Sequence, residues 1–174
     1  MKRFSPFTFH LSLIWFVLAL YNPVFAQDDQ PVSVKTEIFV VNQITGADGA
    51  ATEDLKPAQT ARPGQIVEYR LVATNDSDTT LPAGTIIITG PVPDGTTFVP
   101  DSATPKSERI LTEYSADGTN FSDAEAPVLA GSGDNRTVVD PKDYKAVRWT
   151  LLVPLEPSKE EAFVYRVTVN PPSN

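Results

Sequence analysis

Apolar and polar residues alternate with a period of two along most of this chain, and Pro, Gly and Asp separate the alternating runs. This period places successive side chains on opposite faces of an extended strand. It predicts strands at 32–40, 67–74, 85–89, 96–99, 147–151 and 163–169, and two short runs around 116–118. We therefore expect an all-β protein, a two-sheet sandwich of about seven strands.

The same alternation assigns side chains to a buried face. The run 85–89 is apolar on both faces, which predicts a central or well-covered strand. Trp149 shares its face with Val147 and Leu151, so we expect it at the centre of the core rather than exposed for stacking on a sugar. The residues expected in the core are Tyr69, Leu71, Phe98, Trp149, Phe163, Tyr165 and Val167.

Turn-forming and polar residues mark the connections. Asp117-Gly118 is a strong hairpin signal, and Pro93 to Gly95 predicts a tight turn. The polar stretch 46–63 predicts a loop or an irregular edge segment. The stretch at about 124–142 holds little to bury and predicts a long mobile loop.

The first residues have the order of a secretory signal peptide. Lys2 and Arg3 precede an apolar run, and Val24 and Ala26 supply small residues where a signal peptidase reads. We expect cleavage after Ala26, a single domain at 27–174, and no membrane span after the signal is removed. The alternative is that the apolar run is retained as a membrane anchor.

Charge and composition narrow the function classes. Lys2 and Arg3 are the only charged residues in 1–26, so their removal changes the formal net charge from −8 to −10. Such an acidic chain is not expected to bind nucleic acid or an anionic membrane. The chain contains no Cys, so sheet packing rather than disulfides must stabilise an exported domain.

Five elements occur in an order that resembles a known family. These are Pro63-Gly64, Tyr69 in a strand that ends at Asn75, the Pro93–Gly95 turn, Phe98 to Ser102, and the Tyr-Ser-x-Asp-Gly hairpin before the Trp149 strand. The chain is similar over about 32–169 to the conserved repeat domain of unknown function number eleven. The resemblance implies an immunoglobulin-like sandwich with a structural or adhesive role in bacterial and archaeal envelope proteins. This chain has one copy, and its "EPSKE" segment lacks the Gly usual in the family's final turn.

Little catalytic chemistry is open to the chain. Its one His, His10, lies in the predicted signal peptide, so the mature chain lacks His and Cys and with them the usual catalytic triads, zinc sites and thiol chemistry. Its many carboxylates are expected in solvated turns. We therefore expect no enzyme activity and no cofactor, with calcium as the one possible ligand. The weak calcium candidates are Asp76, Asp78, Asp134 and Asp140.

These observations favour a non-enzymatic exported β-sandwich, periplasmic, extracellular or associated with the outer surface. Its expected role is that of a structural or protein-binding module of the bacterial cell envelope, with an envelope protein or surface polymer as partner. The alternative is a carbohydrate-binding or calcium-dependent adhesion module.

Overall fold

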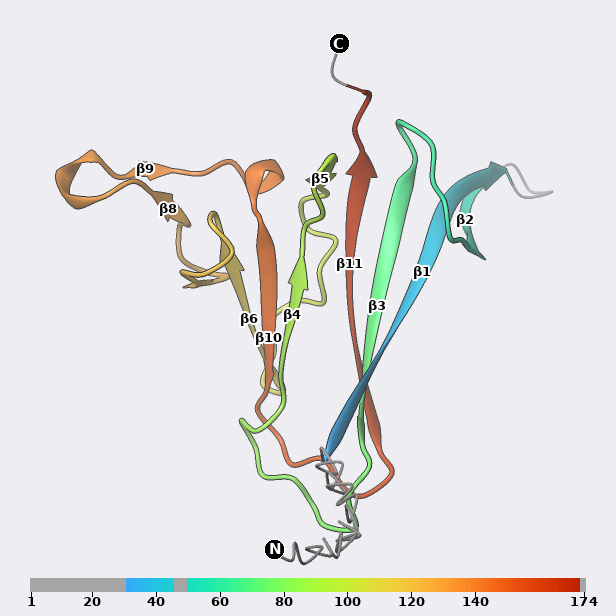
Figure 1. The fold of residues 1–174 in the computed structure, drawn as a ribbon, viewed down its shortest axis with the longest axis vertical. Helices are drawn as coiled ribbons and strands as arrows, with labels where there is room; N and C mark the ends of the chain where they lie inside the picture. The colour runs from blue at the N-terminus through green and yellow to red at the C-terminus, as the bar shows by residue number, and fades with distance from the viewer. Residues whose placement is uncertain (1–30, 46–49, 173–174) are drawn as a thin grey trace, which may run out of the picture.

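Two antiparallel sheets face each other across one hydrophobic core in the computed structural model of the protein (Figure 1). The structure describes residues 31–45 and 50–172, and the predicted signal peptide, residues 1–26, lies outside them. The first described strand begins near one end of the long axis, and the last strand ends near the other (Figure 1). The prediction of an all-β sandwich is confirmed.

The described residues contain eleven strands and two single-turn 3-10 helices. The strands are β1 (Val32–Thr45), β2 (Ala51–Pro57), β3 (Ile66–Asn75), β4 (Ile87–Pro91), β5 (Thr96–Phe98), β6 (Ile110–Ser115), β7 (Ser122–Asp123), β8 (Leu129–Ala130), β9 (Thr137–Val138), β10 (Ala146–Leu151) and β11 (Glu160–Val169). The short helices are η1 (Gly133–Asn135) and η2 (Pro141–Asp143).

The larger sheet has the strand order β2-β1-β3-β11-β5, and the smaller sheet has the order β4-β10-β6-β7. The last strand, β11, lies beside β3 in the same sheet as the first strand. In an immunoglobulin constant domain the last strand lies in the sheet opposite the first. The strand order of this protein therefore differs from that of an immunoglobulin domain.

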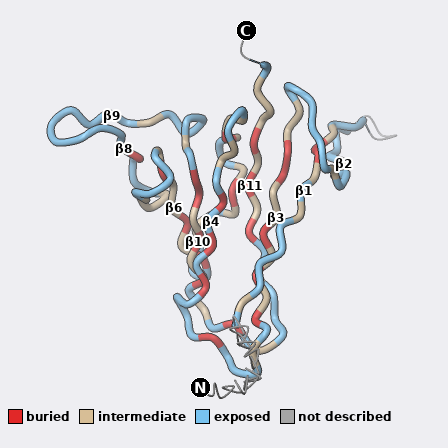
Figure 2. The backbone as a smooth tube through the Cα atoms, viewed as in Figure 1, coloured by how far each residue is buried: buried red, intermediate tan, exposed pale blue. Residues whose placement is uncertain are grey.

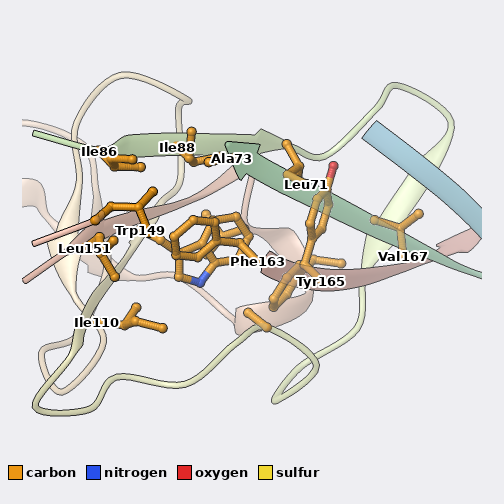
Figure 3. Close-up of a cluster of buried hydrophobic side chains, with 14 of the residues drawn as sticks. Leu71, Ala73, Ile86, Ile88, Ile110, Trp149, Leu151, Phe163, Tyr165 and Val167 are labelled. Carbon is orange, nitrogen blue, oxygen red and sulfur yellow. The ribbon is translucent and has the colours of Figure 1, made fainter. Parts of the chain in front are cut away.

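Trp149 is fully buried at the centre of the core (Figure 3). Its ring stacks on Phe163 of the opposite sheet with 5.5 Å between ring centroids, and its Nε1 donates a hydrogen bond of 3.0 Å to the carbonyl oxygen of Thr104. The aromatic ring thus joins the two sheets while its one polar atom is satisfied, as a buried indole requires.

The residues that the sequence assigns to the core lie on the facing sides of the two sheets. Leu71, Phe98, Trp149, Phe163, Tyr165 and Val167 are buried. Tyr69 is only half-buried and stacks on Tyr165 with 5.1 Å between centroids. Its partial exposure marks the place where the smaller sheet stops covering the larger one.

Two segments differ from the sequence prediction. The stretch 46–63, predicted as a loop or an irregular edge segment, lies at a sheet edge but contains a regular strand, β2, which pairs with β1 from Phe39↔Pro57 to Thr45↔Ala51; residues 46–49 lie outside the described residues. Its polar residues are tolerated because β2 is an edge strand. The strand predicted at 85–89 as central or well covered lies largely in the edge strand β4, so it is not central. Ile88 of β4 and Ile86, directly before it, are buried, whereas Ile87 points to solvent.

The stretch 124–142, predicted as a long mobile loop, is largely loop but contains a small hairpin. β8 and β9 pair with each other and project from the sandwich (Figure 1). Val128, directly before β8, is buried, whereas Leu129 and Val138 are exposed. The predicted mobility of this stretch stays a prediction.

Candidate binding face

The larger sheet extends beyond the sheet that packs on it, so part of its inner face is uncovered. On this face Val34 of β1 lies opposite Ala73 of β3, and Ile38 lies opposite Tyr69. Ala73 is fully buried, but Val34 is 47% exposed and Ile38 is 38% exposed. Much of β1 is accordingly pale blue in Figure 2. We refer to Val34, Thr36 and Ile38, which share this face, as the uncovered row.

An apolar hollow of about 220 Å³ lies at the end of the uncovered row that is nearer Val40. Its lining consists of Ile38, Val40, Val67, Tyr69, Thr96, Val167, Val169 and the segment Ala58 to Ala61. The lining includes no charged side chain. Pockets for drug-sized ligands usually begin at roughly 300 Å³, so this hollow suits one or two inserted side chains better than a separate small molecule.

β4 presents a free backbone edge. It pairs with β10 on one side only, and the carbonyl oxygen of Ile86 accepts a hydrogen bond of 3.0 Å from the backbone nitrogen of Leu151. The direction of backbone hydrogen bonding alternates along an antiparallel strand. Ile87 and Thr89 therefore direct their N–H and C=O groups to the side of β4 that has no neighbouring strand.

This free edge lies next to the uncovered row. β4 rests on Tyr165, whose Oη donates a hydrogen bond of 2.6 Å to the carbonyl oxygen of Pro91. Tyr69 stacks on Tyr165, and Ile38 is the cross-strand neighbour of Tyr69. Across the inner face the order is therefore Tyr165 beneath β4, then Tyr69, then Ile38.

An ion-pair cluster around the buried Glu68 lies on the opposite, outer face of the larger sheet. Glu68 is 3% exposed, and its carboxylate accepts hydrogen bonds from Arg70 Nη2 at 2.9 Å and Arg166 Nε at 3.0 Å. Arg166 also donates to both carboxylate oxygens of Glu53 on β2. Hydrogen bonding to Arg166 lowers the pKa of Glu53. This cluster holds β2 to the sheet, and the segment after β2 forms one wall of the hollow.

The structure does not gather the four calcium candidates into one site. Asp76 and Asp78 lie together in the turn after β3, whereas Asp134 belongs to η1 and Asp140 precedes η2. Asp140 Oδ2 accepts a hydrogen bond from Lys142 Nζ at 3.1 Å. Within 31–45 and 50–172, no three His, Cys, Asp or Glu side chains are grouped as metal ligands would be. Calcium binding stays a prediction without support from a described contact.

Hydrogen bonds stabilise the ionised form of several carboxyl groups. Among the described residues, every carboxyl whose pKa departs clearly from its ordinary value has a lowered pKa, and the cause is hydrogen bonding to the charged form. For Asp117 the donors are Asn120 and Thr119, and for Asp123 they are the backbone of Glu125 and the side chain of Lys106. A general acid that works near neutral pH needs a raised pKa.

Sequence reasoning did not identify the uncovered row. Its apolar alternation is visible in residues 32–40, and it correctly indicates a strand with one apolar face. Which strand of the other sheet covers that face depends on the sheet widths, and no local pattern encodes them.

No helix in the described part of the chain is long and apolar enough to cross a membrane.

Comparison with known proteins gave no match to a family model, a curated protein or a solved structure.

Proposed function

We propose that this protein is an exported, non-enzymatic β-sandwich that binds another protein of the bacterial cell envelope. The observation that carries the proposal is the uncovered row beside a free strand edge and an apolar hollow. Exposed apolar surface of this kind, with few polar groups, is typical of interaction sites. An unpaired edge strand offers a second means of contact.

The sequence supports the envelope as the location. The order of charged, apolar and small residues in 1–26 favours export, and the resemblance to an envelope repeat domain favours a structural or binding role. The periplasm, the cell exterior and the outer surface are all compatible with these features.

Export can be tested directly on the full chain expressed in a bacterial host. N-terminal sequencing of the recovered protein should begin at Gln27, and fractionation should place the protein outside the cytoplasm. Recovery in the cytoplasm with Met1 or Lys2 at the N-terminus would contradict the envelope proposal.

Binding can be tested by chemical crosslinking of the full chain in envelope and cytosolic extracts. We expect a discrete crosslinked species in the envelope extract that is lost when Val34→Ser and Ile38→Ser are combined. Ile44→Ser is the matched control, because Ile44 is also 47% exposed but lies on β1 beyond its pairing with β3. Absence of a specific envelope species, or its retention in the double variant, would count against a protein-binding role for this face.

A further inference from the structure

We propose that the partner contributes an extended strand that pairs with the free edge of β4. Its alternate apolar side chains cover the uncovered row, and its basic residues lie near the two ends of that strand. This inference rests on the proposed protein-binding function and specifies the chemistry of the partner.

The backbone of β4 can pair with an added strand. Ile87 and Thr89 direct their N–H and C=O groups away from β10, and Pro91, which has no N–H, ends the donor edge. An added strand would lie about 4.8 Å from β4. Because β4 rests on Tyr165, that position lies above Tyr69 and Ile38. A strand there would satisfy the free backbone groups and shield the uncovered row in one step.

The side chains of the uncovered row have the spacing of an extended partner. Val34, Thr36 and Ile38 recur at every second residue, which is the spacing of side chains on one face of a strand. An extended partner has the same repeat, whereas a helix presents its side chains at a period of 3.6. The hollow next to Ile38 provides a place for one larger apolar side chain of the partner.

The distribution of charge favours a partner strand with basic ends. β4 and the uncovered row contain no charged residue. Exposed aspartates lie at both ends: Asp94 in the turn after β4, and Asp76 and Asp78 in the turn after β3. The backbone nitrogen of Asp76 donates to the carbonyl oxygen of Pro31, which places that turn beside the start of β1. None of the three aspartates forms an ion pair within the described residues.

The same charges disfavour a second copy of this chain as the occupant. Antiparallel pairing of two β4 strands would bring Asp94 of one copy toward Asp76 and Asp78 of the other. Both copies would also carry the same negative net charge. Like charges across an interface oppose association, whereas Lys or Arg near the ends of a partner strand would complement these aspartates.

The probe is a displayed library of peptides of about nine residues, somewhat longer than an average strand. Apolar residues occupy alternate positions, Ser, Thr or Gln occupy the others, and Lys or Arg occupies both ends. A second library has Asp or Glu at the ends, and a third has the first composition in scrambled order. We expect selection of peptides from the first library only. No selection, or equal selection from the scrambled library, would overturn the proposal.

Selected peptides are then made synthetically, and their affinity for the full chain is measured by fluorescence anisotropy. Combining Val34→Ser with Ile38→Ser should weaken binding at least about tenfold, and Ile44→Ser should not. Asp94→Asn with Asp78→Asn should weaken binding and reduce its salt dependence, and Asp134→Asn, on η1, is the control. Binding that none of these changes affects would overturn the proposal.

Backbone pairing has its own test in the peptide. N-methylation of alternate amides in one set should abolish binding, because these amides face β4, and methylation of the other set should be tolerated. Equal effects of the two sets would overturn strand addition.

Sedimentation of the full chain alone should show a monomer. A dimer that Val34→Ser with Ile38→Ser dissociates would identify a second copy as the occupant and would overturn the proposal.

The two proposals can fail separately. If an envelope protein is crosslinked through the uncovered row but no alternating peptide is selected, strand addition is wrong and the protein-binding function stands. If alternating peptides bind as described but no envelope species is captured, the chemistry of the face is confirmed and the envelope role is contradicted.

Discussion

Glu53 and Arg166 are 113 positions apart in the chain and are joined by two parallel hydrogen bonds. Arg166 Nη1 donates to Glu53 Oε1 at 2.9 Å, and Arg166 Nη2 donates to Glu53 Oε2 at 2.7 Å. This bidentate pairing connects edge strand β2 to β11, although β1 and β3 separate the two strands in the sheet order. It therefore fixes the position of β2 and of the segment that lines the hollow.

Glu53→Gln should loosen β2 without unfolding the sandwich. The variant keeps the shape of the side chain but loses the charge that attracts Arg166. We expect reduced hydrogen-exchange protection of residues 51–57 at neutral pH, with protection of β3 and β11 unchanged. Glu37→Gln is the control, because the ion pair of Glu37 in the described part of the chain is with Lys35 of its own strand, and its weaker attraction to Arg70 does not involve β2. Equal loss of protection in both variants would show that the pairing with Arg166 has no special role.

The same contact predicts a pH dependence. The pKa of Glu53 is lowered from 4.5 by hydrogen bonding to Arg166, so the folded state favours the ionised carboxylate. This contribution is present above the pKa of the unfolded chain and is lost as the pH falls through the lowered folded pKa. The difference in protection between the natural chain and Glu53→Gln should therefore shrink below pH 4.5. A difference that stays constant into acid would contradict this.

Gly90→Ala should destabilise the sandwich, because an added Cβ would lie 2.6 Å from Cε1 of Tyr165. Tyr165 is buried and its Oη donates a hydrogen bond to the carbonyl oxygen of Pro91, so the ring cannot move aside freely. Overpacking of this kind costs about 1–3 kcal/mol. Unfolding in denaturant, followed by the fluorescence of Trp149, measures the loss. The neighbouring Thr89→Ala, at an exposed position, should change stability little.

A double variant separates steric overlap from a backbone effect at Gly90. Tyr165→Leu removes the atoms that would meet the added methyl group, so the cost of Gly90→Ala should be smaller in that background. Additive losses in the double variant would show that the contact with Tyr165 is not the cause.

Asn75 should be intolerant of substitution, since its buried amide ends β3 with a full set of hydrogen bonds. Nδ2 donates to the carbonyl oxygens of Thr79 and Leu155 at 2.8 and 2.9 Å, and Oδ1 accepts from the backbone nitrogen and Oγ of Ser77 at 3.0 and 2.7 Å. Asn75→Ala leaves these groups without their partner and should cost about 1–3 kcal/mol or more.

Asn75→Asp tests whether the two donated bonds matter. An ionised carboxylate would face two carbonyl oxygens, so this variant should be less stable than the natural chain at neutral pH. Part of the loss should be recovered in acid as the carboxyl gains a proton and can donate again. A variant as stable as the natural chain at neutral pH would contradict the predicted role of Nδ2.

The melting temperature of the full chain in millimolar calcium tests the calcium candidates directly. Ligands stabilise a fold only if they bind it more tightly than the unfolded chain, and the described aspartates do not form a group of three or more carboxylates. The scan is run with calcium, with magnesium and with a chelator. A rise that is specific to calcium and is lost in Asp76→Asn with Asp78→Asn would show that two aspartates and backbone oxygens suffice.

Local sequence patterns determined most of the strands and the core of this protein. The alternation around Trp149 and Tyr165 identified buried faces because a strand with one apolar side must cover it. Asp117-Gly118 identified a hairpin because Gly tolerates the positive φ of 81° that the turn requires. These features depend on neighbours in the chain and can be inferred from the amino-acid sequence alone.

Tertiary structure decided which strands lie at the edges and which faces are covered. Residues 85–89 are apolar on both faces, yet they belong largely to edge strand β4, and the polar stretch after Gly46 contains edge strand β2. Val34 and Ile38 have the pattern of core residues but stay exposed because the smaller sheet ends above β3. Sheet order and sheet width come from pairings between distant segments, such as Glu53 with Arg166, and the period of two is the same for a covered strand and an uncovered one.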